Sequence, residues 1–264
     1  MLSDEELQRY ARHLVLREVG GVGQARIRAA RVLIVGAGGL GSPAALYLAA
    51  AGIGKLGLVD DDTVSLSNLQ RQVLFRTADI GRPKVEAGAQ ALNALNPGVQ
   101  VESHAVRLTV ANVMELIEGY DIIADGSDNF ATRFLLNDAC FFGRKVLVSA
   151  AVTEFEGQLA TYKGHEAGCP CYRCLFPEQP PPGTVPSCSE TGVLGAAAGV
   201  MGSLQALEVL KEAAGLGPGL SGKILTYKAL SAEFRIARLP KDPDCPLCGG
   251  HPTIRNLSGH SSAV

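Results

Sequence analysis

The chain has 264 residues, and at about 150 residues per domain this length predicts one large or two small domains. Hydrophobic residues make up 47% of the chain and charged residues 19%, a composition that excludes an intrinsically disordered protein. With 24 Lys and Arg against 26 Asp and Glu, the formal net charge is −2. The chain therefore lacks the basic excess of a nucleic-acid-binding protein, and we expect no nucleic acid among its partners.

The first twenty residues are charged throughout and lack the apolar core of a signal peptide. Ser3 and Glu6 form the pattern of a capping box, which predicts a helix from this point. The longest uncharged stretch, residues 191–207, is short for a membrane span and leads directly into charged residues. Its GAAAG segment at residues 195–199 therefore indicates a closely packed helix. We expect a cytoplasmic protein with reduced cysteines and no membrane contact.

Over residues 1–150, apolar runs alternate with helix-like segments. The expected strands are residues 32–35, 56–59, 99–106, 121–124 and 146–148. The expected helices are residues 40–51, 83–95, 110–118 and 130–142. Strands that alternate with helices predict an α/β fold with a Rossmann-like, doubly wound, mainly parallel sheet.

The second part of the chain, residues 151–250, has a different pattern. Its expected elements are long strands with hairpin character over residues 152–162 and 223–239, and a helix over residues 195–214. We expect these strands to continue the sheet in antiparallel fashion. Five prolines within residues 177–186 predict an irregular loop, because proline cannot donate to a strand ladder. Residues 1–250 are expected to form a single domain, followed by a flexible tail over residues 251–264.

A glycine-rich turn follows the first expected strand. Its G-x-G-x-x-G pattern consists of Gly36, Gly38, Gly39 and Gly41, and it lies between a strand and a helix as nucleotide binding requires. Glycine lets the backbone approach a phosphate, and the helix N-terminus presents free amides. Asp60, at the end of the second strand, suits the hydroxyls of a ribose. A turn that serves only helix–strand packing is the alternative. No G-x-x-x-x-G-K-[ST] occurs, which excludes a P-loop NTPase.

The residues after Asp60 are dense in groups that bind phosphates. Arg71 and Lys84 can both face an anion, and Lys84 is expected at the start of a helix, whose dipole adds to its charge. A dehydrogenase would have to fit a second nucleotide at this place, so the cations favour a polyphosphate. A solvated charged loop remains the alternative.

Together these motifs resemble those of the E1-like adenylating enzymes of the MoeB/ThiF group. They are V-G-x-G-G-L-G, then D-x-D-x-V-x-x-S-N-L-x-R-Q, then G-x-P-K, and the resemblance extends from Arg9 to Cys248. It implies ATP rather than NAD, and a single adenylation domain. It also implies adenylation of the C-terminal carboxylate of a ubiquitin-like sulfur carrier ending in Gly-Gly, with release of pyrophosphate. A MoaD-like carrier of molybdopterin synthesis is expected, and a ThiS-like carrier of thiamine synthesis is the close alternative.

The resemblance also implies roles for residues that match the family's motifs. The nucleotide-binding positions are Gly36, Gly38, Gly39, Gly41, Asp60, Ser67, Asn68, Leu69, Gln70, Arg71, Lys84, Asp128 and Asn129. Among these, Asn68, Arg71 and Lys84 would hold the phosphates. Asp128 matches the family's Mg²⁺-binding aspartate, although its position alone equally fits the N-cap of the next helix.

Arg12 matches an arginine that, in the family, reaches the γ-phosphate bound by the neighbouring subunit. The resemblance therefore implies a homodimer with shared active sites. Without the resemblance, Arg12 indicates only the exposed face of a helix.

Four of the seven cysteines form two C-x₂-C pairs, Cys171 with Cys174 and Cys245 with Cys248. Four thiolates suit tetrahedral Zn²⁺, and a closed four-sulfur site is structural rather than catalytic. A redox-active pair is the alternative, but two such pairs favour zinc. The family carries the same four ligands. His251 is a further possible ligand, for which a complete four-cysteine site leaves no position.

The three other thiols have different surroundings. Cys140 lies in an apolar helical pattern and is expected in the core. Cys169, two residues before a zinc pair, is expected to be a bystander that could compete for the metal. Cys188 matches the thiol that in ThiF-like members bonds covalently to the carrier, so it is a candidate catalytic residue, although MoeB-like members have a cysteine there without a clear need for it.

No rhodanese-like segment follows Cys248 in this sequence, so we expect a separate protein as the sulfur donor. Two functions of other classes remain open. An NAD-dependent oxidoreductase would bind NADH and have little affinity for ATP. A zinc-stapled binding module without catalysis would support no pyrophosphate exchange.

Overall fold

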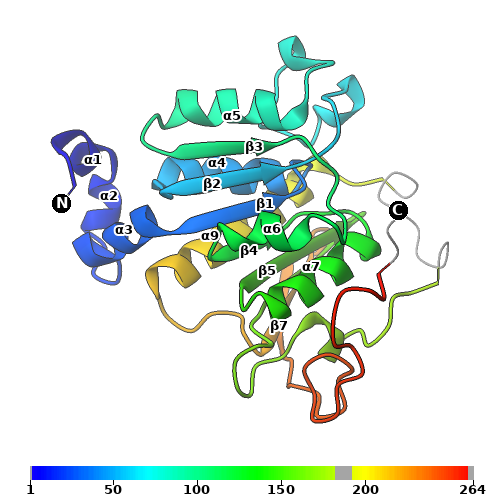
Figure 1. The fold of residues 1–264 in the computed structure, drawn as a ribbon. Coiled ribbons are helices and arrows are strands. Elements are labelled where there is room, and N and C mark those ends of the chain that lie inside the picture. Colours follow the sequence, from blue (N-terminus) through cyan, green and yellow to red (C-terminus); the bar gives the residue numbers. More distant parts are fainter. Residues whose placement is uncertain (1, 182–191, 261–264) are drawn as a thin grey trace.

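The computed structural model describes residues 2–181 and 192–260. A single eight-stranded sheet forms its centre, in the order β3-β2-β1-β4-β5-β6-β7-β8 (Figure 1). The strands are β1 (Arg31–Val35), β2 (Lys55–Val59), β3 (Gln100–His104), β4 (Ile122–Asp125), β5 (Val146–Thr153), β6 (Glu156–Tyr162), β7 (Lys223–Lys228) and β8 (Glu233–Arg238).

The strands from β3 to β5 pair in parallel, whereas β5 to β8 pair antiparallel. Val32, Leu33 and Ile34 of β1 are completely buried on both faces of the sheet. Such continuous apolar runs are typical of parallel strands with helices on both sides. The predicted α/β fold, with a mainly parallel sheet continued by antiparallel strands, is confirmed.

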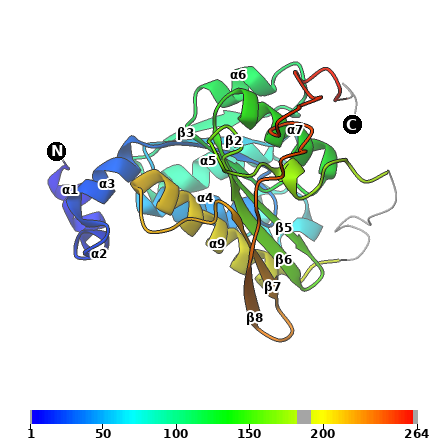
Figure 2. The same ribbon diagram turned by 90° about the horizontal axis from the view of Figure 1, so that it is seen from below.

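Helices cover both faces of the sheet (Figure 2). One face carries α4 (Gly41–Ala51), α5 (Lys84–Leu95) and α9 (Gly195–Ala214), and the other carries α6 (Val113–Glu118) and α7 (Phe130–Phe142). Short 3-10 helices are η1 (Leu66–Asn68), η2 (Thr77–Asp79) and η3 (Tyr172–Cys174). A Cβ at Gly202 would overlap the carbonyl oxygen of Leu40, so α9 and α4 pack closely, as its small residues predicted. Within the described ranges, no helix is long and apolar enough to cross a membrane.

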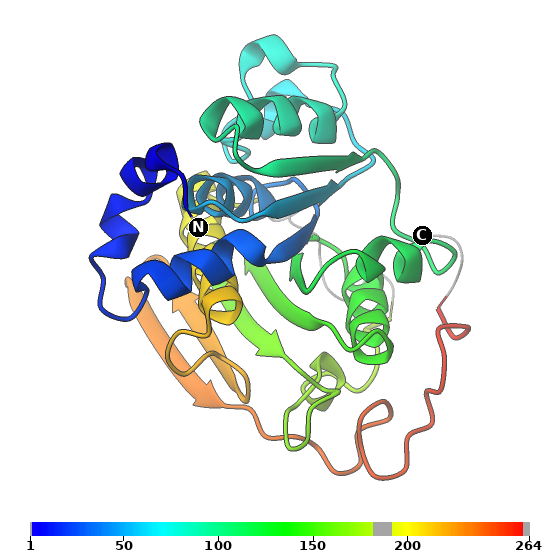
Figure 3. The same cartoon turned by 60° about the vertical axis from the view of Figure 1, so that its left-hand side comes forward.

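Three helices precede the sheet: α1 (Asp4–Arg9), α2 (Ala11–Leu14) and α3 (Gly20–Ala29) (Figure 3). The predicted capping box is present, since Ser3 Oγ accepts from the Glu6 N–H at 3.2 Å and Glu6 Oε2 accepts from the Ser3 N–H at 2.7 Å. Tyr10 is buried, and its hydroxyl accepts a hydrogen bond from Asn96 Nδ2 at 2.9 Å, just beyond α5. These helices therefore lie at the edge of the sheet where β1 and β2 begin.

Strand β5 is longer than the predicted strand over residues 146–148. It runs to Thr153, and the chain turns at Glu154, whose φ is 51°, into β6. Ser149, Ala150 and Ala151 pair with β6 across the hairpin. Small residues have little strand propensity of their own, and the pairing keeps them in the strand. The prediction therefore ended the first of these two strands too early and began the second too early.

Candidate functional site

The glycine-rich turn connects β1 to α4 at the edge of the sheet where the parallel strands end. Gly36 has a φ of +89°, and a Cβ there would come within 2.9 Å of the carbonyl oxygen of Gly126. A Cβ at Gly41 would overlap the carbonyl oxygen of Gly36 itself. The backbone of the turn therefore requires glycine at these two positions whatever it binds.

Gly38 and Gly39 differ, because a side chain would fit at both. The nearest atom to a Cβ on Gly38 would be Gln72 Nε2 at 3.8 Å. A Cβ on Gly39 would meet Arg71 Cγ and Ala198 Cβ at 3.4 Å each. The fold does not require glycine here, whereas close approach of a phosphate to the backbone does. Packing thus explains Gly36 and Gly41, whereas nothing in the packing requires glycine at positions 38 and 39.

Asp60 is fixed beside this turn, immediately after β2. Its Oδ2 accepts from the N–H of Ala37 at 2.8 Å, and its Oδ1 accepts from the N–H of Asp62 at 2.9 Å. Burial raises the pKa of Asp60, and the charge of Lys84 opposes that rise. The side chain keeps 10% exposure, so the carboxylate beside the turn is not completely shielded from solvent.

Lys84 is the first residue of α5 and is only 4% exposed. Its Nζ donates to Asp62 Oδ2 at 2.8 Å and lies 3.7 Å from Asp60 Oδ1. An anion at the turn would therefore share this cation with the carboxylates of Asp60 and Asp62. The sequence reasoning did not single out Asp62, although the D-x-D spacing of the motif contained the signal.

Arg71 belongs to the loop after η1 and packs against the glycine turn. Its Nη1 donates to the carbonyl oxygen of Ser67 at 3.1 Å, and its side-chain carbons lie against Gly39. Of the other predicted residues here, Ser67 and Gln70 are exposed, while Asn68 and Leu69 are half-buried. Polar side chains of this loop thus line the solvent side of the turn.

Gln72 is a residue that the sequence reasoning missed. It is 3% exposed, and its Oε1 has no hydrogen-bond partner among the described residues. Its Nε2 is the atom nearest to the space above Gly38. A buried amide oxygen without a donor is costly, and a bound ligand with a hydroxyl or amino group would supply one. The last letter of the R-Q pair in the motif was the available signal.

The first turn of α9 closes this side of the site. A Cβ at Gly195 would overlap the carbonyl oxygen of Gln70, and Ala198 lies next to Gly39. The positive end of a long helix therefore lies beside Gly39 and Arg71, where it would add to the attraction for an anion.

Asp128 lies in the loop that leaves β4, the neighbour of β1. Its carboxylate is exposed and has no polar partner within the described part of the chain. Asn129 is the N-cap of α7, because its Oδ1 accepts from the N–H of Thr132 at 2.8 Å. The alternative that Asp128 caps this helix is therefore wrong. Its carboxylate is free to bind a cation.

The loop that carries Asp128 is held by a buried carboxylate at its base. Asp125 accepts hydrogen bonds from the Ser127 N–H at 3.0 Å, from Ser127 Oγ at 2.6 Å and from Ser149 Oγ at 2.7 Å. Arg133 Nε lies 3.6 Å from the same carboxylate. None of these residues was predicted, and together they give the exposed Asp128 a rigid support.

Arg12 is not part of this site within one chain. It is exposed on α2, and the helices α1 to α3 lie at the opposite edge of the sheet from the glycine turn (Figure 1). The 11 residues of α4, about 16 Å of helix, separate the two edges. Any contact of Arg12 with a ligand at the turn would have to come from a second copy of the chain.

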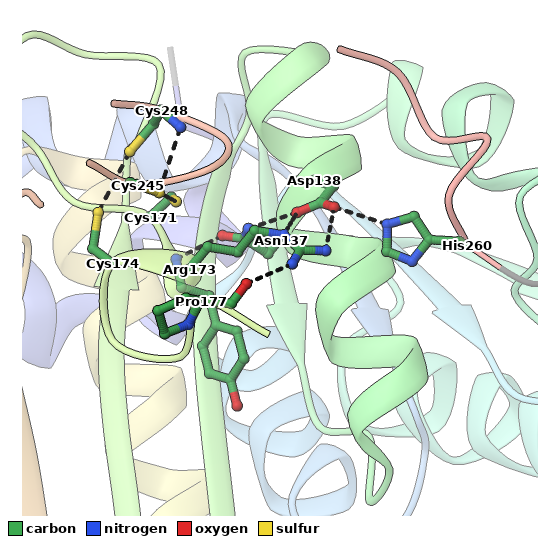
Figure 4. Close-up of polar contacts among 10 residues, drawn as sticks. Asn137, Asp138, Cys171, Arg173, Cys174, Pro177, Cys245, Cys248 and His260 are labelled. Carbon is green, nitrogen blue, oxygen red and sulfur yellow. Dashed lines mark hydrogen bonds and ion pairs between the residues drawn. The ribbon is translucent and has the colours of Figure 1, made fainter. Parts of the chain in front are cut away.

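The four cysteines of the two C-x₂-C pairs meet in space (Figure 4). Their Sγ atoms lie within 4.8 Å of one another, with 3.6 Å from Cys171 to Cys245 and 3.4 Å from Cys174 to Cys248. These separations are far longer than the disulfide bond of about 2.05 Å. Four sulfurs about 2.3 Å from a tetrahedral zinc would be about 3.8 Å apart. The donor set is therefore compatible with Zn²⁺.

The remaining cysteines lie apart from this cluster. Cys140 is 2% exposed in the core as predicted, and burial raises the pKa of its thiol. Cys169 Sγ lies 4.0 Å from Glu166 Oε2 and does not belong to the four-cysteine group. Cys188, the predicted candidate for a covalent role, lies outside the described residues.

Asp138 of α7 connects Arg173, which lies between Cys171 and Cys174, to His260 near the C-terminus (Figure 4). Its carboxylate accepts two hydrogen bonds from Arg173, both at 2.8 Å, and lies 2.8 Å from His260 Nε2. Burial alone would raise the pKa of Asp138, but hydrogen bonds from His260 and Arg173 hold it below its ordinary value. The sequence predicts residues 251–264 as a tail. The structure holds His260 by this contact and Leu257 in the core at 9% exposure.

Comparisons with known proteins agree with this geometry. The ThiF family matches residues 10–247 of the chain. Adenylyltransferase and sulfurtransferase MOCS3 of Bos taurus is 54% identical over 262 residues, which cover 99% of this chain but 57% of MOCS3. A sulfur carrier protein adenylyltransferase of Thermus thermophilus is 50% identical over 256 residues, with 96% of this chain and 94% of the relative covered. The chain thus spans little more than half of one relative and nearly all of the other.

Among solved structures, E. coli MccB superposes with a TM-score of 0.81 at 21% sequence identity. The match covers 92% of this chain and 75% of MccB. At this identity the likeness shows the fold alone.

Proposed function

Because the chain belongs to the ThiF family, we propose that it is an adenylyltransferase that uses ATP to activate the C-terminal carboxylate of a small sulfur-carrier protein. The proposed adenylation domain comprises residues 1–250. Two similar proteins, MOCS3 and the Thermus enzyme, carry adenylyltransferase in their names, and the second is named for a sulfur carrier.

The single observation that carries the proposal is the convergence of groups on the glycine turn. Asp60 lies beside the turn, Lys84 lies 3.7 Å from Asp60, and Arg71 packs over Gly39. A hydroxyl-bearing ribose at Asp60 would place a polyphosphate along Gly38 and Gly39, towards the two cations. Gln72 Oε1 would then gain a donor from the nucleotide.

In the proposed reaction, a carboxylate oxygen of the carrier attacks the α-phosphorus of ATP. A new P–O bond joins the carrier to AMP, and the bond to pyrophosphate breaks, so that pyrophosphate leaves with the electron pair. Two anions must approach each other, and charge accumulates on the leaving group. Arg71, Lys84 and the positive end of α9 would lower the barrier mainly by position and preorganised charge.

A magnesium ion bound at Asp128 would neutralise part of the phosphate charge. The exposed and unpartnered carboxylate of Asp128 suits this role, and the buried Asp125 network would hold its loop in place. Asn129 would contribute indirectly to magnesium binding, because it caps α7 and so fixes the start of the helix next to Asp128.

An NAD-dependent oxidoreductase is less well supported. Lys84 and Arg71 surround the place that a second nucleotide would have to occupy. The four cysteines would hold a structural zinc that ties residues 171–174 to residues 245–248, and reduced thiolates at zinc favour the cytoplasm. A purely structural role for the whole chain would leave the glycine turn and its cations unexplained.

A homodimer with shared sites would explain the position of Arg12. Its guanidinium is exposed at the edge of the sheet opposite the turn and would reach the γ-phosphate held by a partner. Mixed dimers of Arg12→Ala and Asp128→Ala subunits test this role. One site in each mixed dimer would then keep both groups, so partial recovery of activity is expected, and mixed dimers as inactive as the two parents would contradict it.

The sulfur carrier is proposed to be MoaD-like, with a ThiS-like carrier as the alternative, and a separate protein would donate the sulfur. Cys188 is a candidate for a covalent link to the carrier. The test of the function is ATP–pyrophosphate exchange by zinc-replete enzyme with carriers of both kinds. Exchange that needs the terminal Gly-Gly of a carrier is expected. Exchange with none of the carriers would contradict the proposal.

A further inference from the structure

A concave site lies beside the cysteine cluster and is lined by residues at and after the end of α7, by residues that follow β6 and by Cys248. It is an open pocket of ≈ 520 Å³. Its polar wall consists of Arg144, His165, Glu166 and Lys241, and its apolar wall of Phe141 and Phe142. This volume is in the range of small-molecule sites. None of the residues that line it belongs to the proposed adenylation site.

Arg144 occupies a backbone position where glycine is the usual residue. It follows the end of α7, and its φ is 54°, in the left-handed region. The N–H of Arg144 donates to the carbonyl of Phe141 at 3.3 Å, and that of Lys145 donates to the carbonyl of Cys140 at 2.8 Å. These two bonds define a Schellman ending, whose left-handed position favours glycine because a Cβ is strained there. The chain therefore keeps an arginine where the backbone favours a residue without a side chain.

The side chain of Arg144 has no ion pair or hydrogen bond within residues 2–181 and 192–260. Lys241 is nearly as free, since its one hydrogen bond, to the carbonyl of Gly164, is 3.5 Å long. Among the described residues, neither Arg144 nor Lys241 is paired with a carboxylate. Backbone strain at a residue with an unused functional group is typical of a site that binds something.

His165 gives an independent sign of a missing partner. Its side chain is only 9% exposed, and its Nδ1 has no hydrogen-bond partner in the described part of the chain. Buried polar atoms in proteins are nearly always paired. Burial lowers the pKa of His165, and the nearby charges of Arg144 and Lys163 lower it further, against the effect of Glu166. The other ring nitrogen, Nε2, lies 3.9 Å from Glu166 Oε1, so the Nδ1 side of the ring is the one without a partner.

We propose that this pocket binds a tetrahedral oxyanion of the phosphate or sulfate class. Arg144 and Lys241 supply the positive charge, and Glu166 is the one acidic residue of the polar wall. The nearby Lys163 does not contribute, because its Nζ is already paired with Glu212 at 2.6 Å. Guanidinium and ammonium groups bind such oxygens by charge-assisted hydrogen bonds. His165 Nδ1 would add a further hydrogen bond. Phe141 and Phe142 leave room for an organic group attached to the anion.

The competing explanation is that the two cations neutralise the thiolates, because Cys248 also lines the pocket. The test therefore measures both anion binding and zinc content. Isothermal titration of the zinc-loaded protein with phosphate, sulfate and phenyl phosphate is compared with chloride at matched ionic strength. The experiment uses Lys84→Ala protein, so that anions bound at the glycine turn do not contribute.

Saturable binding of phosphate or sulfate, with no saturation by chloride, is expected. Arg144→Gly and Lys241→Ala should each weaken it about tenfold or more. Tighter binding of phenyl phosphate than of phosphate would identify an organic phosphate as the ligand, and equal binding an inorganic ion. Arg255→Ala, which removes an exposed arginine outside the pocket, should leave binding unchanged.

Arg144→Gly also separates the two explanations through stability. If the arginine serves a ligand, the glycine variant keeps its zinc and unfolds about 2 to 4 °C higher, because the strained position is relieved. Ala232→Gly, at another left-handed position with φ of 52°, is the matched control for that relief. Absence of anion binding in the parent protein, or zinc loss in Arg144→Gly, would overturn the proposal. Because Arg144 lies outside the adenylation site, ATP–pyrophosphate exchange by Arg144→Gly in an otherwise native chain should not change.

Discussion

The Nζ of Lys84 donates to the carboxylate of Asp62 at 2.8 Å, so the buried cation at the glycine turn is held by an acidic residue two positions after Asp60. Lys84 is 4% exposed, whereas the side chain of Asp62 is 69% exposed. Asp62 is therefore the solvent-exposed member of the pair. A phosphate that binds Lys84 would share the cation with this carboxylate, and the two negative charges would oppose each other in competition for it.

The first prediction follows from that competition. Asp62→Asn should lower the KM for ATP by about two- to fivefold, because a partly exposed pair contributes at most about 1 kcal/mol. Steady-state pyrophosphate exchange at varied ATP measures this. Asp61→Asn removes a neighbouring exposed charge and is the matched control. An unchanged or higher KM in Asp62→Asn, with the control at the wild-type value, would contradict the competition.

The second prediction separates the two kinds of glycine in the turn. Gly39→Ala should fold with a midpoint within about 2 °C of the wild type, because its Cβ would make only ordinary contacts at 3.4 Å. It should nevertheless lose at least about tenfold in ATP affinity, because the methyl group keeps a phosphate from the backbone.

Gly41→Ala should behave in the opposite way. Its Cβ would overlap the carbonyl oxygen of Gly36, so stability should fall by about 3 kcal/mol or more. Thermal unfolding and equilibrium ATP binding of both variants are the measurements. Wild-type ATP affinity in Gly39→Ala would count against nucleotide binding at this turn.

The third prediction concerns the four-cysteine cluster. Cys174→Ser should reduce zinc from about one ion per chain to a small fraction and lower the unfolding midpoint by more than about 5 °C. Metal analysis and thermal unfolding measure both. Cys169→Ser is the matched control, because Cys169 lies nearby but outside the cluster, and it should retain its zinc. Equal zinc loss in both variants would show that the ligand set is wrong.

The fourth prediction concerns the pH dependence of the Asp138 contacts. The pKa of Asp138 is below its unfolded value of about 3.9, so its contribution to stability is complete above that pH and is lost as the pH falls through the folded pKa. Asp138→Asn should cost about 2 to 4 kcal/mol at pH 7, because Arg173 and His260 lose a buried anion.

Urea unfolding of wild type and Asp138→Asn from pH 7 to pH 3 measures this gap. It should stay constant down to about pH 5 and shrink below about pH 4. Asp121→Asn, in the half-exposed pair with Arg31, should cost less than about 1 kcal/mol throughout. A gap for Asp138→Asn that grows towards acid pH would contradict the assigned sign.

Much of the parallel part of the fold could be predicted from the sequence, because β1, β2 and β4 are almost completely buried and therefore mainly apolar. The strand at residues 31–35 and the helix at residues 130–142 were found nearly to the residue. Helix α3 was missed, since Gly20, Gly21 and Gly23 in its first turn are typical of a loop. Its contacts with the rest of the fold, such as Arg26 Nη1 to the carbonyl of Ala214 at 3.0 Å, hold the helix despite its glycines.

Some residues of the candidate site could likewise be predicted from the sequence, and others could not. Asp60 and Lys84 belong to local motifs and could be found from spacing. Gln72 belongs to the same motif as Asp60, but only the folded chain shows that its amide oxygen is buried without a partner among the described residues. The contact between Asp138 and His260 joins residues 122 positions apart, which no local pattern predicts. Likewise, only the folded chain reveals that Asn129, and not Asp128, caps α7.

The most direct test of the central claim is to observe the adenylated carrier itself. Purified enzyme is incubated with ATP, magnesium and a carrier ending in Gly-Gly, and intact-mass spectrometry of the carrier follows. The account predicts a carrier whose mass has increased by one adenylyl group, in amounts that depend on ATP and are lost in Lys84→Ala. A carrier of unchanged mass, with an enzyme that is folded, zinc-loaded and able to bind ATP, would contradict it.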